Sequence, residues 1–253
     1  MIHLSTLNPL ILEDEPPTRP AAAWIQLLIV IIAPSLGALS GLWIWPGPVG
    51  GTLYALCKVL LYGIPLVILF RRLGLLGIAS WPFQGWTARG SAAGLVSGLV
   101  IGLFILALWW FVLSGRVNVT ALLEAVKENG MTERLRFLIF ATWLCVINSL
   151  LEEIVFRWYV DSRLQRIGVP FLYALPLSAL IFTIHHVIVL SAFFDWPLVL
   201  MGSLGVFTGG VLWSLLLRRY KALSPGWISH ALVDVAIMVI GWWILTPIDG
   251  GPV

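Results

Sequence analysis

Residues 137–159 read FLIFATWLCVINSLLEEIVFRWY, a long apolar run with two adjacent glutamates in its second half. A helix needs about 20 apolar residues to cross the hydrocarbon layer of a bilayer, and this run is long enough to do so. Ionisable side chains in that layer cost about 2.5–3.5 kcal/mol each by insertion measurements, and they are usually functional. The stretch therefore predicts both a transmembrane helix and a site of chemistry.

Six further runs of the same kind surround this one. The chain of 253 residues is 60% hydrophobic and 11% charged, whereas soluble domains carry roughly 25% charged residues. We therefore expect an all-α, polytopic transmembrane bundle of about seven helices (six to eight). Residues 1–20 would form a polar lead-in, 21–245 the membrane domain and 246–253 a short tail. The other six expected spans are 21–45, 50–70, 91–114, 172–194, 197–217 and 226–245.

The distribution of positive charge predicts how the bundle is oriented. Lys and Arg are enriched in the short cytoplasmic loops of membrane proteins, and here one set of loops carries nine of them against four in the other. The richer set adjoins the N-terminus, so we expect a cytoplasmic N-terminus and an external C-terminus in the cell (inner) membrane. The pI near 9.1 reflects this asymmetry, and we expect no nucleic-acid partner. The nine are Arg19, Arg71, Arg72, Arg89, Arg163, Arg166, Arg218, Arg219 and Lys221; the four are Arg116, Lys127, Arg134 and Arg136.

The two glutamates of the fourth run receive different interpretations. Adjacent helical residues point about 100° apart, so Glu152 and Glu153 face different neighbours. Arg157 follows Glu153 by four residues, the spacing of a helical ion pair, which would neutralise Glu153. Glu152 is left with Asn148 one turn before it, and an apolar setting without a cation suits a general base. The alternative is that both acids sit at a helix end in the headgroup layer.

Two later runs carry histidines. His185 and His186 are adjacent, so at most one of them is expected to join Glu152, and their spacing does not choose between them. His230 and Asp234 lie one helical turn apart, and a private hydrogen bond between them is the simplest alternative. Polar groups on three membrane helices satisfy one another by converging, and a converged Glu/His cluster can activate water.

Three ordered segments on these helices resemble the signature of the CPBP family of intramembrane proteases, also called the CAAX-protease or Abi family. The resemblance covers about residues 148–240, and it implies an intramembrane peptidase fold. The segments are Glu152-Glu153-x-x-x-Arg157, Phe182-x-x-x-His186 and His230-x-x-x-Asp234.

The resemblance implies a role for each matching residue. Glu152 would take a proton from the attacking water, and His186, one turn after Phe182, would help to hold that water. His230 and Asp234 would face the scissile carbonyl as an oxyanion hole. Asn is typical of the prenyl-protein branch at the last position, and Asp donates a hydrogen bond only when protonated. Asp234 can instead orient His230. Residues expected to support the site are Glu153, Arg157, Phe182 and Asn148.

The family has been described both as metalloproteases and as glutamate-type proteases, so the cofactor is either none or a divalent metal such as zinc. Glu152, His186, His230 and Asp234 would be an acceptable zinc set. The implied substrate is a membrane-associated protein or peptide, cleaved for instance near its C-terminal segment, within the lipid bilayer.

Two other functions stay open, together with the oligomeric state. One is a proton- or ion-coupled transporter with an intramembrane relay, and the other is a non-catalytic immunity or scaffold protein of the same fold. Lys58, in the second run, is expected to snorkel to the nearer interface.

Overall fold

The computed structural model describes residues 20–76 and 86–245, and in these ranges every regular element is helical. The expected lead-in 1–20 and tail 246–253 fall almost entirely outside the described residues. Seven helices are long and apolar enough to cross a membrane, which confirms the expected bundle. They are Ala21–Ile44, Pro48–Arg71, Ala88–Leu113, Arg134–Arg166, Phe171–Ser191, Trp196–Tyr220 and Ser224–Leu245.

Several of these spans are composed of more than one helical segment. The bounds are α1 Pro20–Leu39, η3 Ser40–Ile44, α2 Pro48–Leu76, α3 Ala88–Leu108 and η5 Trp109–Leu113. After the short surface helix α4 (Thr120–Glu128), the fourth span contains α5 Arg134–Thr142, η6 Trp143–Asn148, α6 Ser149–Glu152, η7 Glu153–Val160 and α7 Asp161–Arg166. The last three spans are α8 Phe171–Ser191, α9 Trp196–Tyr220 and α10 Ser224–Leu245.

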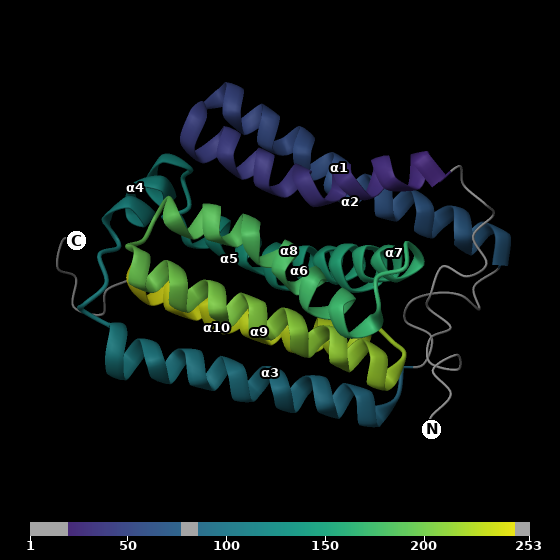
Figure 1. Cartoon of the computed structure of the whole chain (residues 1–253). Helices are drawn as coiled ribbons and strands as arrows, with labels where there is room; N and C mark the ends of the chain where they lie inside the picture. The colour runs from purple at the N-terminus through teal and green to yellow at the C-terminus, as the bar shows by residue number, and fades with distance from the viewer. Residues whose placement is uncertain (1–19, 77–85, 246–253) are drawn as a thin grey trace.

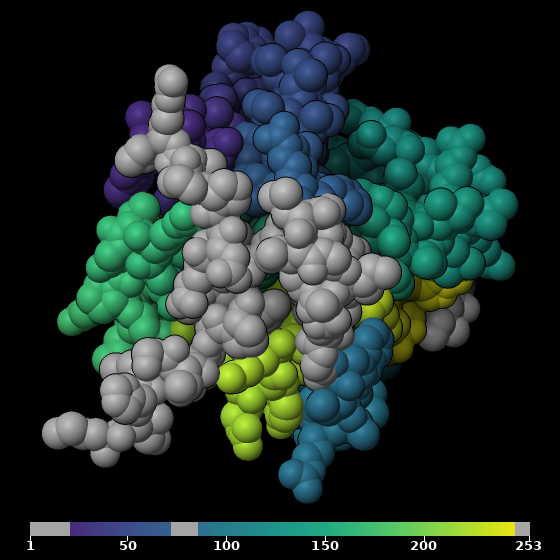
Figure 2. Space-filling model, turned by 90° about the vertical axis from the view of Figure 1, so that its right-hand side faces the viewer, coloured from purple at the N-terminus to yellow at the C-terminus, as the bar shows by residue number. Residues whose placement is uncertain are grey.

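The fourth span runs through the middle of the bundle and the other helices pack around it in pairs (Figure 1). Helix α1 packs along α2, α8 along α9, and α3 along α10. The end view shows α1 and α2 on one side of the bundle and α3 beside the α9–α10 end on the other (Figure 2). Because the second half of the fourth span is enclosed on all sides, every residue from 152 to 164 is buried.

A row of glycines on α3 faces α10. Gly90, Gly94, Gly98 and Gly102 are all buried, four residues apart on one helical face. A Cβ on Gly94 would collide with the carbonyl oxygen of Pro225 in α10, and one on Gly98 would lie 2.9 Å from the Cα of Ser229. Small residues let two membrane helices approach closely, and this row is used inside the chain, between α3 and α10.

The fourth span departs from a regular α-helix on both sides of Glu152. Segments η6 and η7 are π-helical, with wider turns than an α-helix. Neighbouring helices supply partners for the carbonyls of these turns: Trp227 Nε1 donates to the Val146 oxygen at 3.0 Å, and Ser178 Oγ donates to the Phe156 oxygen at 2.7 Å. The irregular helix is therefore held by α8 and α10, the helices that carry the histidines.

Beyond η7 the buried carboxylate of Asp161 is paired with a cation. Both carboxylate oxygens of Asp161 accept hydrogen bonds from Arg218 Nη2, at 2.9 and 3.0 Å, which ties α7 to the end of α9. The guanidinium of Arg218 also lies 3.7 Å from the centre of the Phe171 ring at the start of α8. This contact fixes three spans together at one end of the bundle, close to the glutamates.

Candidate active site

Glu152 lies at the end of α6 and is only 5% exposed. Its Oε1 accepts a hydrogen bond of 2.9 Å from Nδ2 of Asn148, which is also buried. Its Oε2 lies 3.7 Å from Nε2 of His230, on α10. The carboxylate is thus held through one oxygen, while the other oxygen faces the imidazole of a different span.

Glu153 contacts the same imidazole from the other side. Its Oε1 accepts a hydrogen bond of 3.1 Å from Nδ1 of His230 and lies 3.5 Å from Nε of Arg157. The sequence suggested a private Glu153–Arg157 pair facing away from Glu152. The structure differs, since the two adjacent acids meet at the two nitrogens of one ring. The π-helical turn that starts at Glu153 alters the angles between neighbouring side chains, which a regular 100° step does not describe.

The first turn of α10 also adjoins Glu153. A Cβ on Gly226 would lie only 2.7 Å from Oε2 of Glu153. Glycine at this position therefore leaves room for the carboxylate where it stands. The N-terminal end of a helix carries partial positive charge and favours a carboxylate beside it. Gly226 therefore lets α10 present both its N-terminal end and His230 to the glutamate.

Asp234 lies one turn after His230 and is half-buried. Its Oδ2 is 3.8 Å from Nε2 of His230, which is too long for a hydrogen bond. Glu153, which accepts the hydrogen bond from Nδ1, is therefore the acid that orients the imidazole. Asp234 and Glu152 both face the Nε2 side of that ring.

His186 comes from the middle of α8. Its Nδ1 donates to the carbonyl oxygen of Phe182 at 2.8 Å, and because a carbonyl only accepts, the proton is placed on Nδ1. Nε2 of His186 then keeps its lone pair. His185 is buried with its ring centre 4.1 Å from that of His186, and its Nδ1 has no hydrogen-bond partner among the described residues.

One ligand atom each from Glu152, His185 and His186 lies within 4.8 Å of the other two. The sequence suggested that only one of the two histidines could join the glutamate, and the structure brings both to it. This group also differs from the zinc set expected from the sequence, which contained His230 and Asp234 in place of His185. Carboxylate and imidazole are ligands that zinc accepts, and the unpartnered Nδ1 of His185 is compatible with a metal ligand.

Aromatic rings enclose the charged groups. The Trp213 ring stacks on His230 with centroids 3.8 Å apart and 13° between planes. The guanidinium of Arg157 lies over the Phe182 ring at 4.6 Å and near the Trp213 ring at 5.5 Å. Phe182 also meets His186 edge to face at 4.5 Å. These rings exclude solvent and keep Arg157 against Glu153.

The sequence did not point to Trp213 or Tyr62, and it gave Lys58 no part in this site. Trp213 was one of fourteen tryptophans, and nothing in its local sequence separates it from an interfacial anchor. Lys58 and Tyr62 lie on α2: Lys58 Nζ donates to the Tyr62 hydroxyl at 3.0 Å, and that hydroxyl donates to Asn148 Oδ1 at 2.7 Å. The i, i+4 spacing of Lys58 and Tyr62 was the available signal, although it does not identify Asn148 as their partner.

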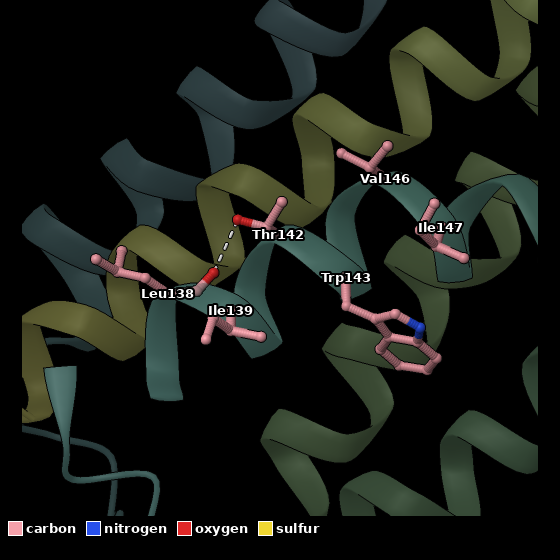
Figure 3. A pocket seen from close by; sticks show the side chains of 6 residues that line it. All are labelled: Leu138, Ile139, Thr142, Trp143, Val146 and Ile147. Atoms are coloured by element: carbon pink, nitrogen blue, oxygen red, sulfur yellow. Dashed lines mark hydrogen bonds between the residues drawn. The ribbon is translucent and has the colours of Figure 1, made fainter. Parts of the chain in front are cut away.

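An apolar groove of about 430 Å³ lies on the outer surface of the fourth span (Figure 3). The polar hydroxyl in it, that of Thr142, is occupied by a hydrogen bond to the Leu138 carbonyl oxygen at 2.8 Å. A groove with this lining suits hydrocarbon chains, and none of the site residues described above contributes to it. It is lined by Leu138, Ile139, Thr142, Trp143, Val146 and Ile147.

Residues 134–236 match a family model described as type II CAAX prenyl endopeptidase, Rce1-like. The match begins with the fourth span and ends in α10, so it includes Glu152, His186 and His230. No curated protein and no solved structure matches the chain. With its seven apolar helices, this is an integral, multi-pass membrane protein. Through residues 134–236, the chain is therefore similar to the family of type II CAAX prenyl endopeptidases described as Rce1-like.

Proposed function

We propose that the protein hydrolyses a peptide bond of a membrane-associated protein or peptide, with Glu152 as the general base. The observation that carries the proposal is the position of the Glu152 carboxylate. Asn148 holds Oε1 at 2.9 Å, and Oε2 faces an imidazole of another span in a water-poor interior. A base that is fixed but not neutralised is what proton abstraction from water requires.

The chemistry follows from the neighbours of Glu152. A water between Glu152 and His186 gives a proton to the carboxylate while its oxygen attacks the scissile carbonyl carbon. Nε2 of His186, whose lone pair is free because Nδ1 donates to Phe182, accepts the second hydrogen of that water and orients it. Glu152 then passes its proton to the leaving amine, so the carboxylate is regenerated.

His230 is the group proposed to stabilise the oxyanion. Glu153 occupies its Nδ1, which leaves Nε2 directed between Glu152 and Asp234. A proton on Nε2 makes that nitrogen a donor to the carbonyl oxygen as negative charge develops on it. Donors fixed in this way at the developing charge commonly contribute a factor of about 10²–10³ to kcat. Asp234 borders the same space and, when protonated, supplies a second donor.

The group formed by Glu152, His185 and His186 supports a metal-dependent variant of this reaction as a second candidate. These three residues would hold a divalent ion such as zinc, which, when bound, acidifies a coordinated water. The roles of Glu153, Arg157 and Trp213 around His230 are the same in both candidates. The metal content of the purified, active protein, measured by elemental analysis, separates them: stoichiometric metal favours the second.

The substrate class proposed here follows from the family description and the membrane location of the site. A membrane-anchored protein presents a segment near its anchor at bilayer depth, and CAAX endopeptidases act near a C-terminus. The apolar groove on the fourth span would accommodate a hydrocarbon chain of substrate or lipid next to the site.

Comparison of membrane-protein termini tests the function. Cells that express the wild-type chain are compared with cells that express Glu152→Ala at the same level. We expect a defined set of new termini in the wild-type cells and their loss in the variant cells. Identical termini in the two cell lines, and no cleavage of a farnesylated CAAX peptide by the purified protein, would refute the proposal.

A further inference from the structure

We propose that Lys58 and Tyr62 of α2 are positioning residues for Glu152, acting through Asn148. The inference rests on the proposed role of Glu152 as the base and adds a functional element from outside the segment 134–236. Its basis is a continuous series of three hydrogen bonds that joins the Lys58 ammonium to the Glu152 carboxylate. We call this series the Lys58–Glu152 chain.

Each hydrogen bond of the chain has only one possible direction. The ammonium of Lys58 can only donate, so the Tyr62 hydroxyl accepts a hydrogen bond from it at 3.0 Å. The hydroxyl in turn donates a hydrogen bond to Asn148 Oδ1 at 2.7 Å. An ionised Glu152 can only accept, which requires the Asn148 amide to present Nδ2 to it at 2.9 Å. With the amide turned the other way, its oxygen would face the carboxylate, so the two ends of the chain fix its orientation.

The depth of Lys58 is consistent with this role. Its position is 10 residues from the start and 13 from the end of the span Pro48–Arg71, or roughly 15–20 Å from each end at 1.5 Å per residue. A lysine side chain is too short to reach either interface from there. The expectation that Lys58 snorkels is therefore wrong for this arrangement. Its ammonium lies instead near the rings of Tyr54 and Tyr62, 5.6 and 5.2 Å from their centres.

The site contains more carboxylates than cations, and Lys58 adds a cation close to it. Three carboxylates, from Glu152, Glu153 and Asp234, surround His230, and Arg157 pairs with Glu153. Among the described residues, no guanidinium is paired with Glu152. The Lys58–Glu152 chain brings a cation to it without direct contact. The carboxylate is therefore oriented through Oε1, and its Oε2 remains directed toward His230.

The experiment compares four variants that separate the chain from general packing. Lys58→Met removes the cation, and Tyr62→Phe keeps both the cation and the ring but interrupts the chain. Lys58→Arg retains a donor cation. Tyr54→Phe is the matched control, because it removes a hydroxyl from the same helix one turn before Lys58. Among the described residues, that hydroxyl forms no hydrogen bond.

Two measurements are made on the purified proteins. With the farnesylated CAAX peptide, or a substrate identified from the termini, we expect Lys58→Met and Tyr62→Phe each to lower kcat by about 10- to 100-fold with little change in KM. The double variant should lose no more than the larger single loss, because both changes interrupt one chain. Lys58→Arg should restore most of kcat, and Tyr54→Phe should match the wild type.

The second measurement needs no substrate. A hydrophobic carbodiimide adds to a carboxyl oxygen, and mass spectrometry gives its rate of addition at Glu152, whose Oε1 becomes available once the hydrogen bond from Asn148 is lost. We expect faster modification in Lys58→Met and Tyr62→Phe than in the wild type and Tyr54→Phe, at unchanged melting temperature. Equal rates in all four proteins would overturn the Lys58–Glu152 chain, even if the wild type cleaves peptide. Faster modification of Lys58→Met and Tyr62→Phe, together with a wild type that cleaves nothing, would support the Lys58–Glu152 chain and refute the proposed function.

Discussion

The segment 134–236 and the helices that precede it bury different kinds of residue. The fourth span buries Glu152, Glu153, Arg157, Asp161 and Arg163 within twelve residues, whereas α3 buries a row of glycines against α10. Charges inside a membrane protein are kept where they act, while small residues serve close packing. We therefore expect the chemistry to reside in the matched segment and the preceding helices to act as scaffold, apart from the role proposed for Lys58 and Tyr62.

The largest effect is expected from Glu152→Gln. The amide keeps the size and the hydrogen bond to Asn148 but cannot take a proton, so kcat should fall by about 10²–10⁴-fold. The protein should remain folded and membrane-inserted, with a melting temperature near that of the wild type. Peptide cleavage and thermal unfolding in detergent measure the two properties. A folded Glu152→Gln protein with full activity would contradict the assignment of the base.

Glu153→Gln is the matched variant at the adjacent position. It leaves the guanidinium of Arg157 buried without its acid, a change that typically costs about 3–5 kcal/mol. It also weakens the hydrogen bond that orients His230. We therefore expect a lower melting temperature together with reduced kcat, in contrast to Glu152→Gln. An unchanged melting temperature would mean that Arg157 is stabilised by its aromatic neighbours alone.

The two histidines of α8 are expected to differ in size of effect. His186→Ala removes the nitrogen proposed to orient the water, and kcat should fall by about 100-fold, as for the loss of a typical general-catalytic contact. His185→Ala should keep most of the activity in a glutamate-type mechanism, because its ring packs against Phe156 and Phe182. Equal losses in both variants, with loss of bound metal, would favour the metal-dependent candidate.

Much of this arrangement follows from sequence patterns. Long apolar runs determine the seven spans, because crossing a bilayer requires length and hydrophobicity that a sequence displays directly. Glu152, His230 and the pair His185–His186 stand out because ionisable residues are rare in such runs, and only the family resemblance chose His186 over His185. The structure brings them together as the motifs suggested, with Asn148 bonded to Glu152.

The rest depends on angles and distances that no local pattern contains. The π-helical turns beside Glu152 change which faces adjacent residues occupy, and they depend on partners such as Trp227 on another helix. For that reason the bond from Glu153 to His230 and the approach of His185 to Glu152 were not predicted. Tyr62 and Asn148 are 86 positions apart, and their contact exists only once α2 packs beside the fourth span.

A glycine of α3 gives a smaller effect that tests the scaffold half. Gly94→Ala places a methyl group against the backbone of Pro225, and overpacking of this kind typically costs about 1–3 kcal/mol. The matched control is Gly63→Ala in α2, where a Cβ meets nothing within 4 Å. We expect a lower melting temperature for Gly94→Ala only, with kcat per folded molecule changed little. A selective loss of kcat would instead mean that α3 positions His230 through α10.

Orientation is the property that these substitutions leave unchanged, and it decides which compartment supplies the substrate. We expect the α7–α8 turn to face the cytoplasm and the α4–α5 turn to face outward, because the nine cations outnumber the four in short loops. Thr132 and Pro170 are exposed residues just beyond the two ends of the fourth span. Cysteines are introduced there singly, in a chain in which Cys57 and Cys145, both buried, are replaced by Ala.

An impermeant thiol reagent should label Thr132→Cys in intact cells and Pro170→Cys only after the membrane is opened. His230 lies six residues into α10, whose first residue follows the cation-rich end of α9. His230 is then nearer the cytoplasmic surface, whereas His186 lies 15 residues after the first residue of α8, and we expect the substrate segment to enter from the cytoplasmic side. The reverse labelling would mean that the bundle has the opposite orientation and that the substrate comes from the outer face. It would leave the proposed chemistry intact, because the distances among Glu152, His186 and His230 do not depend on orientation.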